Sequence, residues 1–186
     1  MNHAMNSAMG RAGTGGRKRT GPIAWAGILL ELTKAKITAA VTLSVATGHL
    51  LFIETLSFSV ILPAAGVFLL ACGSAALNQV QEARIDRRMA RTRGRPVPSK
   101  RIPAEWALFA ALALIGAGLY LLSSIRTHTL TLLVLAGLAV FWYNGVYILL
   151  KRITAFAVVP GALVGSIPPL IGWAAGGGMI TDPAIL

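Results

Sequence analysis

Three oxygen-bearing side chains, those of Asn78, Glu82 and Asp86, stand four residues apart in an otherwise apolar chain. On a helix each step of four residues turns by about 40° and climbs about 6 Å, so the three side chains line one stripe. Carboxylate and amide oxygens suit Mg2+, which keeps several waters and bridges one or two carboxylates to the phosphates of a substrate. The spacing is therefore that expected of a site for Mg2+ and a phosphorylated ligand.

Ordinary charge at a membrane surface is the alternative explanation of the same spacing. Carboxylates beside arginines at such a boundary form surface ion pairs, which contribute little to stability. On spacing alone the two interpretations are equally supported. Two neighbouring features favour the site: Gln79 and Gln81 add polarity where an apolar segment should continue, and arginines follow densely over residues 84–101. Guanidinium groups match phosphate oxygens by paired hydrogen bonds.

The elements that must position these side chains are long apolar segments. Mean hydropathy is +0.71, and 12% of the residues are charged, about half the share in a typical soluble domain. Because backbone groups in lipid must be satisfied within the segment, spans of this kind are expected to be helices of roughly 20 residues. The predicted fold is an all-α, polytopic transmembrane helical bundle with five spans, at residues 37–53, 58–77, 106–125, 130–150 and 154–173.

The basic residues predict the orientation of this bundle. Of the 17 lysines and arginines, all except Arg126 flank the spans on one side. The positive-inside rule makes that side, with the N-terminus and the polar stripe, cytoplasmic in a bacterial-type inner membrane. The net charge of +11 is therefore interpreted as a topology signal, and no nucleic-acid partner is predicted.

The N-terminal residues are expected to lie outside the bundle. Residues 1–20 are rich in Gly, Ala and Arg and predict a disordered basic tail. Residues 21–34 are typical of an amphipathic lead-in on the membrane surface. A cleaved signal peptide is not expected, because Glu31 and Lys34 interrupt the apolar stretch and no small-residue cleavage site follows. Residues 21–186 are predicted to form one transmembrane domain.

A few single residues have ordinary interpretations. Cys72 is expected to be a small buried apolar side chain. His49 and His128 fall near the opposite membrane face, where an interfacial histidine is favoured over a haem ligand. Tyr143 and Asn144 either face a cavity or serve packing, and the sequence does not distinguish the two.

Longer motifs around the polar stripe resemble those of a known family. Residues 78–96 read NxxxExxxDxxMxRTxxRP, which resembles the first signature of UbiA-type prenyltransferases, in particular the protoheme IX farnesyltransferase (heme o synthase) branch. Residues 32–37 (LTKAKI) are similar to that branch's entry to its first helix. Its later motifs are similar to residues 150–152 (LKR) and 160–175 (PGALVGSIPPLIGWAA). The resemblance covers nearly all of residues 31–175.

The resemblance implies a function and a set of site residues. Members transfer a farnesyl group from farnesyl diphosphate to a vinyl group of protoheme IX, giving heme o, in a water-poor cavity within the lipid. Mg2+ and cationic side chains neutralise the diphosphate leaving group. By match to the motifs, the metal would be held by Asn78, Glu82 and Asp86, and the diphosphate would be bound by Arg91, Arg95, Lys151 and Lys34.

The sequence also departs from the family pattern. Glu82 stands where the family often has Asp, and Ala83 and Arg84 stand where Arg and Asp are frequent. Family members have further spans and a second acidic motif, whereas here the only acid after Glu105 is Asp182. The expectation is an N-terminal part that ends before the second acidic motif, in association with a chain that supplies the missing helices.

Three alternatives to heme o synthesis stay open on the sequence. Within the enzyme class, an aromatic quinone precursor is the second acceptor considered. A transporter or channel fragment predicts polar residues deep within spans, whereas this cluster lies at one membrane face. A non-catalytic truncated membrane protein predicts no prenyl transfer unless a second chain completes the site.

Overall fold

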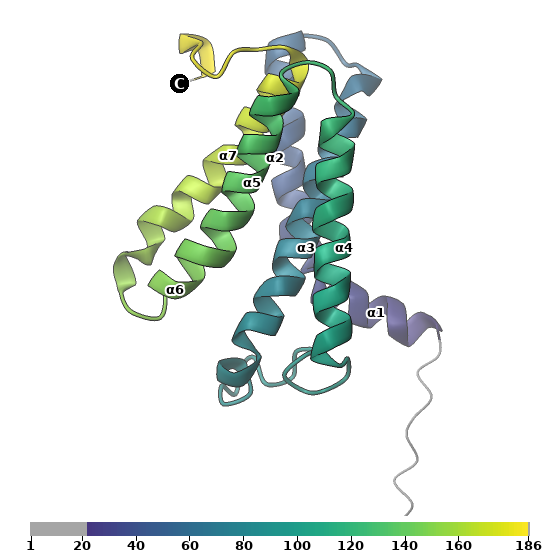
Figure 1. Ribbon diagram of the computed structural model, residues 1–186, viewed down its shortest axis with the longest axis vertical. Helices are drawn as coiled ribbons and strands as arrows, with labels where there is room; N and C mark the ends of the chain where they lie inside the picture. Colours follow the sequence, from purple (N-terminus) through teal and green to yellow (C-terminus); the bar gives the residue numbers. More distant parts are fainter. Residues whose placement is uncertain (1–21, 186) are drawn as a thin grey trace, which may run out of the picture.

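The computed structural model describes residues 22–185, and regular structure in this range is entirely helical (Figure 1). The predicted tail of residues 1–20 lies outside the described residues. The long helices are α1 (Pro22–Leu32), α2 (Ala35–Ile53), α3 (Ile61–Asp86), α4 (Ala104–Ser123), α5 (Thr129–Phe141) and α7 (Val158–Gly176). The short elements are η1 (Phe58–Val60), the π-helical turn η2 (Trp142–Tyr147), α6 (Ile148–Leu150), η3 (Ala155–Ala157) and η4 (Pro183–Ile185).

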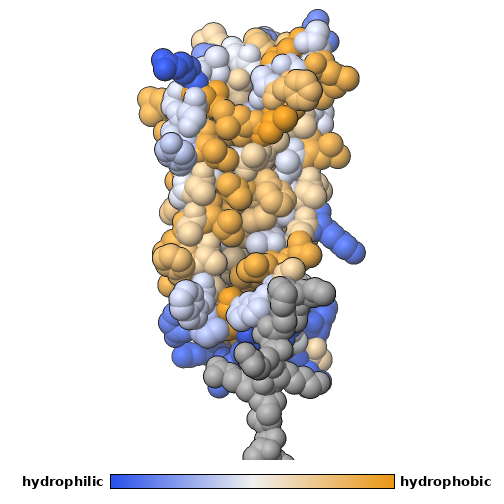
Figure 2. All heavy atoms as spheres, turned by 90° about the vertical axis from the view of Figure 1, so that its right-hand side faces the viewer, coloured by the Kyte–Doolittle hydropathy of each residue, from blue (hydrophilic) through white to orange (hydrophobic). Residues whose placement is uncertain are grey.

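Five helical segments are long and apolar enough to cross a membrane, which confirms the predicted all-α bundle of five spans. They are Ala35–Ile53, Phe58–Asp86, Ala104–Ser123, Thr129–Leu150 and Val158–Gly176. Figure 2 shows the result on one face of the molecule, where apolar side chains form a broad band between hydrophilic ends. The chain is a multi-pass membrane protein.

The second span differs from its predicted range, because α3 runs on to Asp86 instead of ending near residue 77. Residues 78–86 contain neither Gly nor Pro, so nothing in the backbone stops the helix. The polar side chains of this extension also have partners in other elements. The whole Asn78, Glu82 and Asp86 stripe therefore lies on one rigid helix, beyond its apolar part.

Close helix contacts hold the bundle together. Figure 1 shows α3 and α4 as an antiparallel pair and α7 beside α5, and α7 also packs along α2. The α2–α7 contact depends on two glycines. A Cβ atom at Gly172 would overlap the carbonyl oxygen of Val45, and one at Gly48 would overlap that of Pro169. Small residues permit this approach of two backbones, as is common between membrane helices.

The two histidines have structural partners. His49 is buried on α2, and its ring nitrogens lie 3.2 Å from the carbonyl oxygen of Gly172 and 2.8 Å from the Ser59 hydroxyl. His128 is exposed, and its Nε2 lies 3.2 Å from the carbonyl oxygen of Gly177. Both rings therefore serve local packing, and His49 links α2 to α7 next to their glycine contact.

Candidate functional site

The polar stripe of α3 is buried although it lies beyond the apolar part of the helix. Asn78, Glu82 and Asp86 are 2%, 8% and 4% exposed. Buried charges are costly unless opposite charges and hydrogen bonds compensate them. The surroundings of each side chain therefore decide whether the stripe forms a site.

Each of the two carboxylates is paired with a cation from a distant part of the chain. Lys151 Nζ lies 2.8 Å from Glu82 Oε2, and Arg152 lies 3.9 Å from the other oxygen of Glu82. Arg95 Nη1 lies 2.7 Å from Asp86 Oδ2. The loop after α3 and the end of the fourth span thus both fold back onto the stripe.

Asn78 connects the stripe to a third cation. Its amide is assigned from the hydrogen-bond network, with the nitrogen donating to Glu82 Oε2 at 2.8 Å. The amide oxygen then accepts from Lys34 Nζ at 3.2 Å and from the Tyr143 hydroxyl at 3.3 Å. Lys34 lies just before α2, so three separate segments of the chain meet at this amide.

The Lys34 amine is in an environment that disfavours its charge. Burial lowers its pKa below the ordinary lysine value, and the positive charges of Arg95 and Lys151 act in the same direction. The carboxylates of Glu82 and Asp86 raise this pKa and oppose the effect. A further negative charge at this position would stabilise the charged amine.

The site as a whole carries more positive than negative groups. Two carboxylates face the amine of Lys34 and the cations of Arg95, Lys151 and Arg152. Such an excess in a partly buried place suits a multiply charged anion. Guanidinium and ammonium groups are the usual protein ligands of phosphate.

Arg91, the fourth cation predicted for the site, is placed differently. It is exposed on the turn after α3, and no hydrogen bond or ion pair among the described residues joins it to the stripe. Its neighbour Thr92 is buried and donates to the backbone oxygen of Asp86 at 3.2 Å. Lys34, Arg95 and Lys151 are thus brought together around the carboxylates, and Arg91 lies outside this group.

Two tyrosines lie beside the stripe and line the cavity: Tyr143, for which the sequence left a cavity and a packing role open, and Tyr147, which the sequence analysis missed. Tyr143 and Tyr147 stack with ring centroids 5.7 Å apart and planes 18° from parallel. Lys151 Nζ lies 5.5 Å from the centroid of the Tyr147 ring. Tyr143, Tyr147 and Lys151 are spaced by four residues, like the stripe on α3, and this second periodic set was the available signal.

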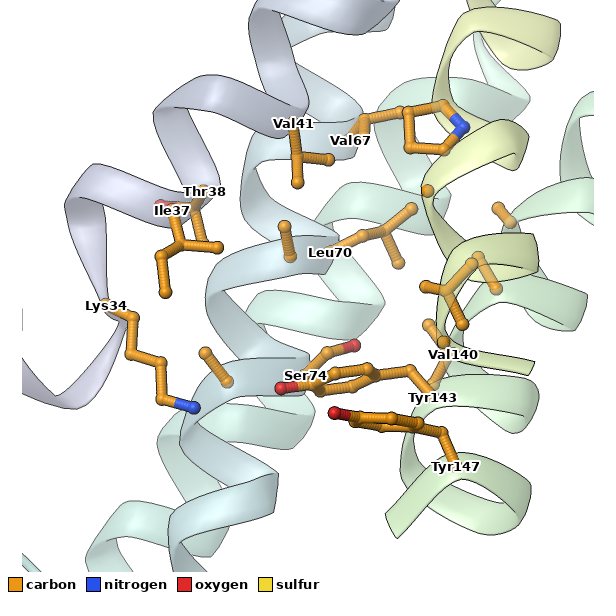
Figure 3. A pocket seen from close by; sticks show the side chains of 18 of the residues that line it. Lys34, Ile37, Thr38, Val41, Val67, Leu70, Ser74, Val140, Tyr143 and Tyr147 are labelled. Carbon is orange, nitrogen blue, oxygen red and sulfur yellow. The ribbon is translucent and has the colours of Figure 1, made fainter. Parts of the chain in front are cut away.

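An apolar cavity of about 470 Å³ opens beside the polar cluster. Helices α2, α3, α5 and α7 and the π-helical turn η2 line it. Figure 3 shows Lys34 reaching toward the cavity from one side and the stacked rings of Tyr143 and Tyr147 from the other. At the opposite end lie Val41 and Val67. The volume is in the range of pockets that bind small molecules.

The donor set fits Mg2+ only together with a ligand. Within the described residues, no group of three or more His, Cys, Asp and Glu side chains gathers as a metal site. The stripe offers two carboxylates and one amide, with cations on both carboxylates. Mg2+ commonly takes just one or two protein carboxylates and completes its shell with water and phosphate oxygens. The residues present therefore suit a metal that binds with a phosphorylated substrate.

Fold and site together define a class of protein: a multi-pass membrane protein with a cation-rich polar cluster at the mouth of an apolar cavity between its spans. An amphiphilic phosphate ester matches both parts of such a site. Comparison with known families agrees, because the model of the UbiA prenyltransferase family matches residues 35–186. The chain belongs to the UbiA prenyltransferase family.

Curated relatives extend this result. The protoheme IX farnesyltransferase of Oleidesulfovibrio alaskensis is 40% identical over 155 residues, which cover 83% of this chain and 54% of that protein. The protein of the same name from Geobacter sulfurreducens is 36% identical over 157 residues, or 84% of this chain and 57% of the relative. The chain spans about half the length of the curated relatives it matches.

A solved structure supports the fold. The chain resembles a digeranylgeranylglyceryl phosphate synthase with a TM-score of 0.72 and 21% identity, over 81% of this chain and 53% of that one. At this identity the likeness concerns the arrangement of the helices alone.

Proposed function

We propose that this chain acts in the transfer of a farnesyl group from farnesyl diphosphate to a vinyl group of protoheme IX, giving heme o. The observation that carries the proposal is the cation-rich site at the mouth of an apolar cavity, since the two parts match the two ends of a prenyl diphosphate. The acceptor is inferred from the relatives that are named protoheme IX farnesyltransferase.

The diphosphate end of the substrate would occupy the polar cluster. Asn78, Glu82 and Asp86 would hold Mg2+, which supplies positive charge to the leaving diphosphate when it is bound. Lys34, Arg95 and Lys151 surround the stripe and would bind the phosphate oxygens. Arg91, which is exposed on the neighbouring turn, is the fourth cation proposed for the diphosphate. These cations would stabilise the negative charge that grows as the bond between C1 and the diphosphate breaks.

The prenyl end would lie in the apolar cavity, and the distance from the polar cluster to the far end of the cavity suits a farnesyl chain. Val67 and Asn78 are 11 residues apart on α3, which is about 16 Å along a helix. Three bonds of an extended chain span about 3.8 Å, so one four-bond isoprene unit spans about 5 Å and three span about 15 Å. A fourth unit would meet the buried side chain of Ile171, the lining residue nearest the end of α7.

A prediction about chain length follows from this geometry. Ile171 is buried at the far end of the cavity. Replacing it with alanine should raise the affinity for geranylgeranyl diphosphate relative to farnesyl diphosphate by about tenfold. The vacated space would admit about two more carbons of the longer chain, at about 0.8 kcal/mol for each buried carbon. Competition binding with geranyl, farnesyl and geranylgeranyl diphosphates measures the ratio.

Ile148→Ala is the matched control for this length experiment. Ile148 is equally buried but does not line the cavity, so its replacement should leave the order of the three ligands unchanged. An unchanged order in Ile171→Ala as well would show that this end of the cavity does not select the chain.

The proposed orientation places the site on the cytoplasmic side of a bacterial inner membrane. Its support is the basic excess at this end of the bundle, including the loop of residues 87–103. Farnesyl diphosphate is a charged, water-soluble headgroup on a lipid tail, so entry from that side would need no charged group to cross the membrane.

Prenyl transfer in membranes tests the proposed function directly. Membranes containing this chain would receive protoheme IX, farnesyl diphosphate and Mg2+, with and without a co-expressed C-terminal half of the Oleidesulfovibrio alaskensis relative. We expect heme o to form when the second half supplies the other acidic motif. If no heme o forms in either mixture but diphosphate is released when an aromatic quinone precursor is added, the acceptor is the quinone precursor and not protoheme IX. Lack of diphosphate release with either acceptor would mark a non-catalytic chain.

A further inference from the structure

A sharp break separates α1 from α2, and it carries one of the site's cations. Lys34 has φ 51° and ψ 48°, a left-handed conformation that side chains other than glycine rarely adopt. Such a conformation persists only where the surrounding structure determines it. The break also leaves the last carbonyl groups of α1 without partners in their own helix.

Gln79 on α3 holds this break from the inside. Its side chain is 1% exposed, and its amide nitrogen donates to the carbonyl oxygens of Glu31 at 3.1 Å and Leu32 at 3.0 Å. Because both partners are acceptors, only the amide nitrogen can face them. The amide oxygen of Gln79 is buried without a partner among the described residues, so these two bonds are the whole of its polar contact.

Asn78 and Gln79, which are neighbours on α3, therefore contact the two ends of the short segment that joins α1 to α2. Gln79 binds the backbone that precedes the break, and Asn78 accepts from the amine of Lys34 at 3.2 Å. One step along a helix turns by about 100°, so the two side chains leave α3 in different directions and enclose the segment between them. The position of the amine is thus tied to α3 through the backbone of the break.

We propose that Gln79 is a positioning residue that presents Lys34 to the diphosphate. It touches neither substrate nor metal. By fixing the end of α1 it fixes the left-handed turn from which the Lys34 side chain enters the cavity mouth, as Figure 3 shows for that side chain. This inference rests on the proposed function, because it needs an anion at the site.

A second contact on the same break provides the control. Arg101 lies 2.6 Å from the carboxylate of Glu31 and also donates to the backbone oxygen of Gly94. Both side chains of this ion pair are more than 40% exposed, and exposed pairs contribute little. The inner contact of Gln79 should therefore position Lys34, while the outer contact of Arg101 should not.

The test measures, by calorimetry, the affinity of the purified full chain in lipid nanodiscs for inorganic diphosphate in the presence of Mg2+. Gln79→Met keeps the length of the side chain and removes its donor. We expect this variant to bind diphosphate about tenfold more weakly, because the displaced Lys34 amine would lose its charge-assisted hydrogen bond to the diphosphate. Lys34→Met should weaken binding to a similar degree, and the double variant should be no weaker than Lys34→Met alone, because both changes remove the same contact. Arg101→Met should bind like the wild type.

The outcomes separate this inference from the proposed function. Lack of diphosphate binding by the wild-type chain would overturn the function and the inference with it. Wild-type binding with an unaffected Gln79→Met variant, or with additive losses in the double variant, would overturn the inference alone. If the Gln79→Met chain does not fold, Gln79→Asn takes its place, because its shorter amide does not reach the two carbonyl groups. The comparison of the single variants with the double variant is then made with Gln79→Asn.

Discussion

Replacing Asp86 with asparagine should lower the rate of prenyl transfer by about two to three orders of magnitude, the scale seen when one electrostatic contact to a transition state is lost. Asp86 is buried at the end of α3, and Arg95 binds one of its oxygens at 2.7 Å. Asparagine keeps the shape but removes the charge, so the site loses a metal ligand in the proposed assignment and Arg95 loses its partner. The measurement is heme o formation and diphosphate release in membranes that contain this chain together with the co-expressed C-terminal half of the Oleidesulfovibrio alaskensis relative.

Glu105→Gln is the matched control for the Asp86 variant. Glu105 is an exposed carboxylate in the first turn of α4, on the same side of the bundle. Its replacement should leave the rate within a factor of about two, because exposed groups contribute little. A melting curve of Asp86→Asn would separate loss of chemistry from loss of fold. A stable Asp86→Asn chain with nearly wild-type turnover would remove Asp86 from the site.

Replacing Gly172 with alanine should destabilise the bundle by about 3 kcal/mol, the upper range for overpacking. The added methyl group would overlap the carbonyl oxygen of Val45 and lie 2.9 Å from the backbone nitrogen of His49. These are backbone atoms in the middle of α2, so they cannot turn aside as a flexible side chain does. The two helices must move apart, and the far end of the cavity opens with them. Unfolding in mixed detergent micelles measures the loss.

Gly165→Ala, on the same helix, gives the comparison. No atom lies within 4 Å of a Cβ at Gly165, so alanine should be neutral or should stabilise the helix by up to about 1 kcal/mol through its higher propensity. Equal stabilities of the two variants would show that the α2–α7 contact is looser than this structure has it.

The spans of this chain were predictable because lipid imposes a simple condition on sequence. A helix that crosses hydrocarbon must be apolar over its whole length, and that property is read along the chain without knowledge of any neighbour. The boundaries of α2, α4 and α7 fall within four residues of the predicted ones. The end of α3 was missed by nine residues, because hydropathy detects where lipid ends and not where a helix ends.

The stripe of Asn78, Glu82 and Asp86 was predictable for a related reason. Helical periodicity alone places side chains four residues apart on one face. The same rule applies to Tyr143, Tyr147 and Lys151, but apolar packing explains aromatic residues in a span equally well. The structure separates a site role from apolar packing, because the two rings stack on each other and Lys151, which pairs with Glu82, lies over the Tyr147 ring.

Which cations meet the stripe was decided by the tertiary structure. Lys151 is 69 residues from Glu82, and Lys34 is 44 residues from Asn78. Arg91 and Arg95 lie in the same short turn, yet only Arg95 faces Asp86. The two arginines carry the same charge, and Arg91 is even closer to Asp86 along the chain, so the path of the turn makes the difference.

The sequence by itself therefore determined the number of spans, the polar stripe and the family motifs, since each depends on residues close together along one helix. The tertiary structure decided which cations meet the stripe, the cavity, and the contacts of Gln79 with the end of α1. These depend on how closely α2 can approach α7, and on where the break after α1 meets α3. Such contacts arise from side-chain packing between segments far apart in the chain. The motifs named Lys34, Arg95 and Lys151, but no local pattern shows that these three meet the stripe and Arg91 does not.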